Sequence, residues 1–289
     1  MVKFKYYQFG KNGNMITEEV LKGIFQPKNP KWKTSITKVE PNRLITRGYP
    51  QEDLMGTISF PEMIYLLIKG ELPSQDQVRM LQAVLISFCD HGVTPPSTQA
   101  ARLMASAGSP VNACLAGGIL AFGENHAGAI EIAMKMLQEG KKLKENSEIP
   151  IEDLADKLIN SFLDNNKKVP GFGHRYHKED PRAPRLMELS KEYNCFGKHS
   201  ELVLTMQNLM FERKGIKMNI DGANAAILSD IGFSWRIGCG LFIIGRIPGI
   251  LAHVDEEKSN ETPFRKIFDL GDIAEDLNSP YINFNPINE

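Results

Sequence analysis

Three histidine-bearing turns contain the residue types that acid–base chemistry requires. His126 stands in Phe122–Ala129, just ahead of a segment in which apolar residues have helical spacing. A histidine at a helix N-terminus feels the positive end of the helix dipole, which favours its neutral form. The N–H of a neutral imidazole can donate to a carbonyl oxygen that becomes an enolate. An ordinary histidine near a helix cap is the alternative interpretation.

The second turn combines glycines, a histidine and basic side chains. His174 follows Pro170–Gly173, and Arg175, Lys178 and Arg182 come soon after it. Glycine lets a ligand approach the backbone closely, and the basic side chains suit an anion. A solvated basic loop is the alternative. A metal site at His174-x-x-His177 is disfavoured, because no third ligand of matching spacing follows.

Two further polar positions complete the candidate set. His91 lies in a turn ahead of Ser97, which can cap the next helix. A structural histidine is the alternative there. Asp221 is the one carboxylate in the uncharged stretch Met218–Asn224, where a helix N-cap is its alternative role.

Helices are the elements that must position these turns. Ser59–Glu62 and Ser74–Gln77 have the capping-box pattern. Apolar residues recur every three or four positions in 151–162 and 202–210. Asp180-Pro181 opens a further helix, with Asp180 as its N-cap. The sequence therefore predicts a mainly α fold.

Strand signals are confined to Thr34–Tyr49, where two runs flank the turn Glu40-Pro41-Asn42. Neither GxGxxG nor GxxxxGK[ST] is present, so a nucleotide-binding α/β fold is disfavoured. The charge-free stretch Leu103–Gly123 is broken by a Gly-Ser-Pro turn, which indicates two short buried helices rather than a membrane span. The polar segment Gly140–Pro150 is expected to be an exposed loop.

Composition narrows the class of protein. The 289 residues include 34 basic and 35 acidic side chains, a formal net charge of −1, whereas proteins that bind nucleic acid by charge have a basic excess. Hydrophobic residues make up 42% and charged residues 24%, as in soluble globular proteins. The four cysteines have no CxxC spacing, and the N-terminus has no apolar run. We expect a cytoplasmic protein that binds neither nucleic acid nor membrane.

Taken together, these turns resemble the citrate synthase superfamily, and they follow one another in the same order. The resemblance runs from about residue 46 to about residue 265. Its strongest motifs are Pro170–Arg175 with Asp180-Pro181-Arg182, and Asn219-Ile220-Asp221. Further motifs are Arg47-Gly48-Tyr49, Leu66–Pro73, and Asp90-His91-Gly92 with Ser97-Thr98.

Within the superfamily the chain is most similar to citryl-CoA lyases, including the lyase module of ATP-citrate lyase. Its shortness is one reason, because full citrate synthases are longer. The other reason is the C-terminal sequence, which contains Leu241–Arg246 and Gly249–His253 followed by Pro263-Phe264-Arg265. Synthases share parts of that sequence.

The resemblance implies a role for each candidate residue. Asp221 moves the proton on the acetyl-CoA methyl, His126 hydrogen-bonds the thioester oxygen of the enol, and His174 acts on the oxaloacetate carbonyl. The groups implied to bind substrate carboxylates are His91, Arg182, Arg246 and Arg265. The groups implied to bind coenzyme A are the backbone of Val169, Pro170, Gly171, Phe172 and Gly173, and the side chain of Lys178.

Two departures from the family pattern affect these roles. Ala127 stands where synthases carry the first of two glycines after the histidine, so its methyl group could reshape the thioester pocket. The interval from His174 to Asp180 is one residue shorter than in common synthases, which weakens the role of Lys178 more than that of Arg182.

The family fold is an almost all-helical large domain with a smaller helical domain that closes over the substrate. We expect the small domain at 127–223 and the large domain at 1–126 and 224–289. The implied activity is that of a citryl-CoA lyase, which cleaves citryl-CoA to acetyl-CoA and oxaloacetate. A citrate or 2-methylcitrate synthase is the first alternative, and a non-catalytic CoA-binding subunit is the second.

The resemblance also implies ligands and partners. No metal and no tightly bound cofactor is expected, and coenzyme A enters as part of the substrate. The expected small-molecule substrates are an acyl-CoA and oxaloacetate. Arg265 resembles an arginine that reaches into a neighbouring subunit's site, so a homodimer or higher homo-oligomer is expected. A citryl-CoA synthetase is the expected partner enzyme.

Overall fold

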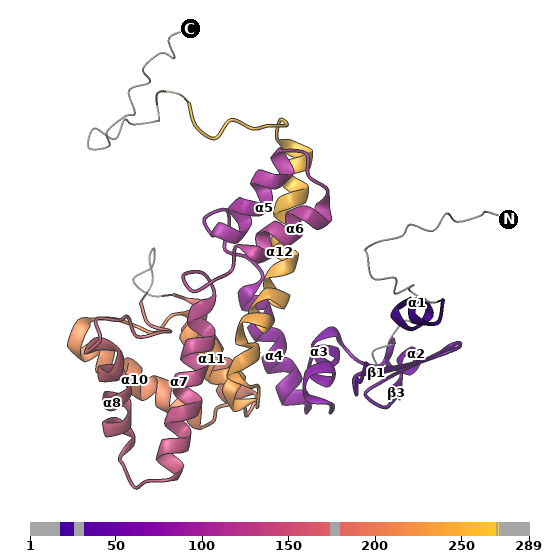
Figure 1. The fold of residues 1–289 in the computed structure, drawn as a ribbon. Helices are drawn as coiled ribbons and strands as arrows, with labels where there is room; N and C mark the ends of the chain where they lie inside the picture. The colour runs from indigo at the N-terminus through magenta and orange to yellow at the C-terminus, as the bar shows by residue number, and fades with distance from the viewer. Residues whose placement is uncertain (1–17, 26–31, 174–179, 270, 272–289) are drawn as a thin grey trace, which may run out of the picture. The chain divides into compact units, whose positions relative to one another are not determined.

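The computed structural model describes residues 18–25, 32–173, 180–269 and 271. The chain divides into two compact units, residues 1–57 and 58–289 (Figure 1). Helices dominate the second unit, and the only strands among the described residues belong to the first. The predicted mainly α class is therefore confirmed.

The first unit contains a small antiparallel sheet. The strands of this sheet are β1 (Thr37–Glu40), β2 (Arg43–Thr46) and β3 (Tyr49–Pro50), in the order β1-β2-β3. The described helices of the unit are α1 (Glu18–Phe25) and α2 (Gln51–Leu54). Thr37 pairs with Thr46, and Asn42 closes the hairpin with a φ of 59°. The hairpin predicted between residues 34 and 49 is confirmed, with the short β3 added to it.

The described residues of the second unit form a series of helices. They are α3 (Phe60–Lys69), α4 (Gln75–Phe88), α5 (Pro96–Ser106), α6 (Val111–Leu120), α7 (Gly128–Glu145), α8 (Ile151–Leu163), α9 (Arg182–Glu192), α10 (Lys198–Lys214), α11 (Ile220–Asp230), the 3-10 turn η1 (Trp235–Ile237) and α12 (Gly238–Asn260). Both predicted capping boxes are present, at Ser59 and at Ser74. Each box satisfies two N–H groups that the helix itself leaves unpaired.

Helix α11 is the centre of the main core. All but its first carboxylate and its last residue are buried, and alanines let its neighbours approach closely. It packs against α7, α10, α9 and α4 (Figure 1). The apolar side chains around it include Met134, Leu137, Leu202 and Met206, all fully buried. A helix that is buried on every side holds its first residues in a fixed position.

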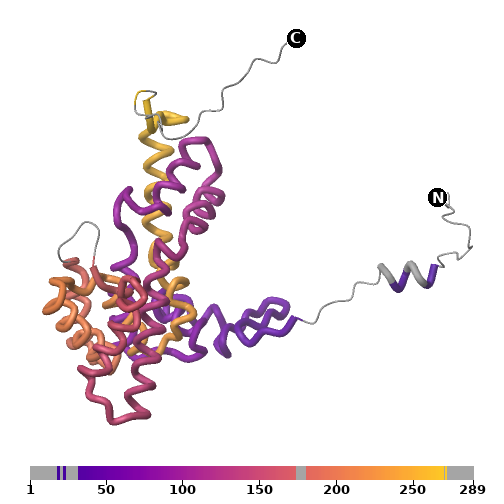
Figure 2. Tube along the Cα trace, turned by 60° about the vertical axis from the view of Figure 1, so that its left-hand side comes forward, coloured from indigo at the N-terminus to yellow at the C-terminus, as the bar shows by residue number. Residues whose placement is uncertain are grey.

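Helix α12 runs through the second unit and joins two clusters of apolar residues. Its first half packs against α4 and α7, and α5 and α6 lie along its second half (Figures 1 and 2). The smaller cluster consists of Ala101, Ala105, Cys114, Ile250 and Val254. The two short helices predicted for residues 103–123 are thus confirmed as part of α5 and as α6.

By length and composition alone, one described helix, Trp235–Asn260, could cross a membrane. It contains a buried arginine, Arg246, and packs against several other helices of this unit. Core helices of globular proteins have the same composition.

Two local predictions were wrong. Gly140–Pro150 is not an exposed loop throughout, because α7 continues to Glu145. Gly140 is buried where α7 meets α8 and α10, and a Cβ there would lie 2.8 Å from Leu158. Helix α9 has Pro181 rather than Asp180 at its N-cap, although Asp180 Oδ1 does accept from the N–H of Arg182 at 3.1 Å. The predicted division of the helical unit at residues 127 and 223 stays a prediction.

Asp230, the last residue of α11, caps another helix. Its carboxylate accepts hydrogen bonds from the backbone N–H groups of Gly197, His199 and Ser200 and from the ring of His199, at 2.8–3.0 Å. Burial alone would raise the pKa of this carboxyl, but the hydrogen bonds from His199 and Ser200 outweigh it and lower the pKa. One side chain therefore joins the start of α10 to the end of α11.

Removing this cap should cost stability. We expect Asp230→Ala to lower the free energy of unfolding by about 2–4 kcal/mol, because several buried N–H groups lose their acceptor. The loss should shrink as the pH falls through the lowered pKa of Asp230, because a carboxyl with a depressed native pKa stabilises only when ionised. Urea unfolding followed by circular dichroism measures both effects. The exposed pair Lys198–Glu201 offers the control, and Glu201→Gln should change stability by less than about 0.5 kcal/mol.

Candidate functional site

The C-terminal end of α4 holds two arginines that come from other helices. Arg182 Nη1 donates to the carbonyl oxygen of Ser87 at 3.2 Å, and Arg246 Nε donates to that of Phe88 at 2.5 Å. The last carbonyls of a helix have no partner within it, and they carry partial negative charge. The end of α4 therefore brings the first residue of α9 and the middle of α12 to one place.

Arg182 is held in a fixed orientation by a second contact. Its Nε and Nη2 donate to the two carboxylate oxygens of Asp180 at 3.0 and 2.8 Å, and the Asp180 side chain is only 1% exposed. A forked pair of this kind fixes the plane of the guanidinium group. Ser87 is fixed in turn by Asn224 of α11, whose Nδ2 donates to the Ser87 hydroxyl at 3.0 Å. The Arg182 side chain is still 26% exposed, so a ligand can reach it.

Arg246 is buried and incompletely paired. The residue is 3% exposed, and its Nη1 has no hydrogen-bond partner in the part of the chain that the structure describes. Its guanidinium carbon lies 5.0 Å from the centre of the Phe242 ring. Burial lowers the pKa of this guanidinium below its ordinary value, and the nearby positive charge of Arg182 lowers it further. A buried donor without a partner is costly, and an anionic oxygen is the kind of acceptor that would satisfy it.

Asp221 lies beside the two arginines, in the first turn of α11. The predicted alternative role of Asp221 as an N-cap is wrong, because Asn219 Oδ1 accepts from the N–H groups of Asp221 and Gly222 at 3.0 and 3.2 Å. The carboxylate of Asp221 has no hydrogen-bond donor among the described residues and is free for chemistry. Burial raises its pKa to about 6, although the charges of Arg182 and Arg246 act in the opposite direction. Asp221 can therefore hold or release a proton near neutral pH.

His126 lies between two aromatic rings and a buried hydroxyl. Its Nε2 is 2.8 Å from the hydroxyl of Ser97, and its ring stacks on Phe122 at a centroid distance of 4.8 Å. The edge of Phe242 faces it at 6.4 Å. Phe242 therefore contacts both His126 and Arg246, which places the histidine next to the arginines.

The substitution at Ala127 is accommodated by strain in the backbone. Ala127 is the N-cap of α7 and has a φ of 67°, in the left-handed region that glycine adopts more readily. The turn is closed by hydrogen bonds between Gly123 and His126 at 2.9 and 3.0 Å. Ala127 thus adopts a left-handed conformation directly between His126 and the helix.

The loop predicted to bind coenzyme A is joined to the start of α11. Gly173 N–H donates to the carbonyl of Lys217, and Asn219 donates to the carbonyls of Gly171 and Gly173, at 2.6–3.0 Å. Gly171 has a φ of 85°, and a Cβ there would lie 2.6 Å from the Cα of Gly222. The loop residues Val169, Pro170, Gly171 and Phe172 are all buried. Only a glycine pair allows this contact, which fixes the loop beside Asp221.

Two of the predicted residues, His174 and Lys178, lie outside the described residues, as does the pair His174-x-x-His177. Among the residues that are described, no group of three or more His, Cys, Asp or Glu side chains could hold a metal ion. The roles proposed for these positions stay predictions.

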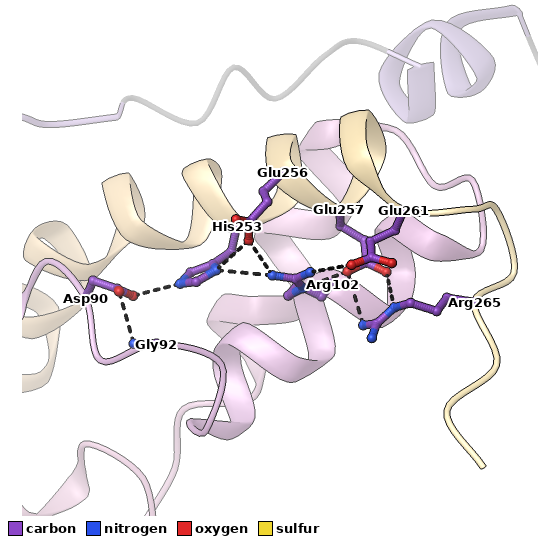
Figure 3. Close-up of polar contacts among 8 residues, drawn as sticks. All are labelled: Asp90, Gly92, Arg102, His253, Glu256, Glu257, Glu261 and Arg265. Atoms are coloured by element: carbon purple, nitrogen blue, oxygen red, sulfur yellow. Dashed lines mark hydrogen bonds and ion pairs between the residues drawn. The ribbon is translucent and has the colours of Figure 1, made fainter. Parts of the chain in front are cut away.

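The structure brings the His91 turn to the arginines but not Arg265. Asp90 Oδ2 accepts from the N–H of Gly92 at 3.0 Å, and the charge of Asp90 acts on Arg246. Arg265 instead pairs with Glu257 at 2.8 and 3.1 Å (Figure 3). Glu257 comes eleven residues after Arg246 on α12, about 16 Å along the helix at 1.5 Å per residue. Arg265 therefore contributes nothing to this group of residues within its own chain.

Several residues of the site had no individual signal in the sequence. Ser87, Phe122 and Phe242 have residue types that are common in any helical core. Their roles depend on partners that are distant in the chain, as in the pair Ser87 and Asn224. Ser97 was expected to cap a helix, but it is fully buried within α5 and contacts His126 instead.

Comparison with known proteins identifies the family of the chain. The family "Citrate synthase, C-terminal domain" matches residues 28–83 and 74–267. The citrate/2-methylcitrate synthase of Bacillus subtilis is 30% identical over 229 residues, which cover 77% of this chain and 59% of that protein. The chain thus spans less than two thirds of the length of this relative.

Two solved structures are similar over most of the chain. Citryl-CoA lyase from Hydrogenobacter thermophilus is 44% identical with a TM-score of 0.78, covering 87% of this chain and 96% of that one. ATP citrate lyase from Methanothrix soehngenii, in complex with citrate and coenzyme A, is 20% identical with a TM-score of 0.72, covering 97% of this chain and 47% of that one. The second likeness concerns the fold alone. The family match over most of the chain shows that the chain belongs to the citrate synthase family.

Proposed function

We propose that the protein is a citryl-CoA lyase, which cleaves citryl-CoA to acetyl-CoA and oxaloacetate. The observation that carries this proposal is the buried Arg246, whose Nη1 has no partner among residues 18–25, 32–173, 180–269 and 271, beside Arg182 and a carboxyl of raised pKa. Such a site suits a substrate with several carboxylates and a proton to be delivered. Citryl-CoA lyase from Hydrogenobacter thermophilus supports the choice, because its chain is covered almost completely by this one.

In the proposed reaction the substrate carboxylates bind to Arg182, Arg246 and His91. His174 takes the proton of the citryl hydroxyl, and the electron pair of the broken O–H bond forms the carbonyl of oxaloacetate as the carbon–carbon bond breaks. The electrons of that bond move onto the thioester, whose oxygen accepts a hydrogen bond from His126. Asp221 then donates a proton to the enolate carbon, which becomes the methyl group of acetyl-CoA.

The contacts of His126 fit its proposed role as a donor. The Ser97 hydroxyl can donate to Nε2, which leaves the proton of a neutral ring on Nδ1. The stacked Phe122 holds the ring plane while charge develops on the thioester oxygen. A donor that is fixed in advance costs no reorganisation during the reaction.

A citrate or 2-methylcitrate synthase is the second candidate, favoured by the sequence similarity to synthases. The same residues run the reaction backwards, and a synthase also hydrolyses the thioester. The coverage of the relatives favours the lyase, since this chain matches 96% of the lyase but 59% of the synthase. A non-catalytic CoA-binding subunit explains less, because binding alone does not require a desolvated carboxyl such as Asp221.

The proposal includes partners that follow from the family resemblance. Coenzyme A enters as part of the substrate, and no tightly bound cofactor is needed for the chemistry above. Arg265 acts in the site of a neighbouring copy, so the active unit is at least a homodimer. A citryl-CoA synthetase supplies the substrate, and the proteins work in the cytoplasm.

The direct test follows both products. Purified protein is given citryl-CoA, and oxaloacetate is measured by NADH consumption with malate dehydrogenase. In parallel, a thiol reagent detects free coenzyme A from acetyl-CoA plus oxaloacetate. We expect rapid oxaloacetate formation without thiol release in the wild type, and a loss of at least about 1,000-fold in Asp221→Asn with CoA binding retained, because proton transfer contributes rate rather than affinity. Steady thiol release would identify a synthase instead.

The raised pKa of Asp221 predicts opposite pH profiles for the two directions. Cleavage needs Asp221 protonated, so its kcat/KM should fall as the pH rises through about 6. Condensation needs Asp221 ionised, so its kcat/KM should rise over the same interval. Initial rates measured in both directions between about pH 5 and about pH 8, an interval that spans the raised pKa of Asp221, provide the test. Profiles that move in the same direction would contradict the role of Asp221.

Arg246 should matter for binding more than for stability. We expect Arg246→Met to fold with a stability within about 1 kcal/mol of the wild type, because it replaces a half-paired buried charge with an apolar chain of similar length. Its KM for citryl-CoA should rise by about 30-fold or more, since a buried charge contact to a carboxylate is lost. Thermal unfolding and steady-state kinetics give the two values. An unchanged KM would show that Arg246 is structural.

A further inference from the structure

A chain of polar contacts runs along one face of α12, beyond the site already described. It joins Asp90, His253, Arg102, Glu257 and Arg265, with Glu256 and Glu261 at its edge (Figure 3). Glu257 is fully buried between the two arginines. Burial alone would raise the pKa of its carboxyl, but hydrogen bonds from Arg265 and Arg102 outweigh it and lower the pKa. The buried pair of Arg102 and Glu257 therefore fixes this end of the chain of contacts.

The spacing along α12 explains why these contacts are continuous with the site. Arg246, Gly249, His253 and Glu257 follow one another at intervals of three or four residues and so share one face of the helix. A Cβ at Gly249 would overlap the carbonyl of Cys89. The helix therefore lies directly against the turn after α4, and His253 stands one turn beyond that close contact.

His253 has a partner on each ring nitrogen. Nε2 lies 3.0 Å from Asp90 Oδ1, and Nδ1 lies 3.5 Å from Nη1 of Arg102. A carboxylate only accepts and a guanidinium only donates, so a proton on Nε2 and none on Nδ1 satisfies both hydrogen bonds, while Glu256 Oε2 also lies 3.7 Å from Nδ1. Arg102 is itself fixed by Glu256 and Glu257, each at 2.6 Å. The ring cannot turn without losing a partner, and its side chain is only 15% exposed.

Asp90 passes this constraint to the turn that carries His91. Its Oδ1 faces His253, while its Oδ2 accepts from the N–H of Gly92 at 3.0 Å. Gly92 has a φ of 66°, a conformation that closes the turn around His91. Burial alone would raise the pKa of Asp90, but hydrogen bonds from Gly92 and His253 outweigh it and lower the pKa. The ionised side chain also adds its charge next to Arg246.

We propose that His253 is a positioning residue for the carboxylate-binding part of the site. Through Nε2 it holds Asp90, and Asp90 holds the His91–Gly92 turn and the negative charge beside Arg246. This inference rests on the proposed function, since His91 and Arg246 are the groups proposed to bind substrate carboxylates. His253 contacts no reacting atom, so its effect is expected in substrate affinity.

The test compares two substitutions that differ in one donor. His253→Gln keeps an N–H that can reach Asp90, whereas His253→Leu has a similar volume and no donor. We expect His253→Leu to raise the KM for citryl-CoA and the Kd for oxaloacetate by about fivefold, the size for one half-exposed hydrogen bond to a charge. The kcat should stay within about twofold, and His253→Gln should restore both constants to within about twofold of the wild type.

A matched control and a double substitution separate positioning from a structural role. Asp255→Asn removes a charge from the exposed face of the same helix and should change neither constant. In an Asp90→Ala background, His253→Leu should add nothing further to KM or Kd, because both act through one contact. Thermal unfolding of each variant checks that it folds.

The outcomes distinguish this inference from the proposed function. An active wild type with unchanged constants in His253→Leu would overturn the inference alone, and so would equal losses in His253→Leu and His253→Gln. A wild type that is inactive in both assays would overturn the lyase and synthase proposals. Calorimetry with oxaloacetate alone would then decide, because weaker binding in His253→Leu supports positioning. A wild type that binds no oxaloacetate would overturn both the positioning role of His253 and the proposed function.

Discussion

The site depends on the hydrogen bonds that two arginines donate to the last carbonyl groups of α4. Ser87 and Phe88 offer these carbonyls to Arg182 and Arg246, from helices that follow in the chain by about one hundred residues or more. Guanidinium groups so close together would repel one another if Asp180, Asp90 and Asp221 did not lie around them. Tight glycine contacts between α12 and the end of α4 are what allow this approach.

The buried helix α11 serves the site in a different way. Its N-cap Asn219 binds the first N–H groups of the helix, so the carboxylate of Asp221 is not used as a cap and has no hydrogen-bond donor within the described part of the chain. The same side chain of Asn219 donates to the loop at Gly173. One residue thus sets the position of the proposed proton donor and of the loop proposed to bind coenzyme A. A helix with exposed sides would allow both to shift.

Local patterns in the sequence predicted local structure, and long-range contacts escaped them. The boxes at Ser59 and Ser74 involve groups three residues apart, so their residue types were sufficient. Gly140 lies inside a helix against which α8 and α10 pack, and the residues next to Gly140 in the sequence do not reveal these contacts. The pair of Arg102 and Glu257 spans 155 residues. The site residues themselves were found through family motifs, whereas the support from Asp90 and His253 required the structure.

The electrostatics of the candidate site favour the proposed cleavage over the reverse condensation. In the free protein, burial raises the pKa of Asp221 while Arg182 and Arg246 pull it down. Carboxylates that bind to the arginines neutralise their charge and also bring negative charge near Asp221, and both effects raise its pKa. In the proposed reaction, binding of citryl-CoA therefore loads the proton that the departing enolate needs. In the condensing direction oxaloacetate has the same effect, which makes Asp221 a stronger base for the acetyl-CoA methyl but leaves less of it ionised.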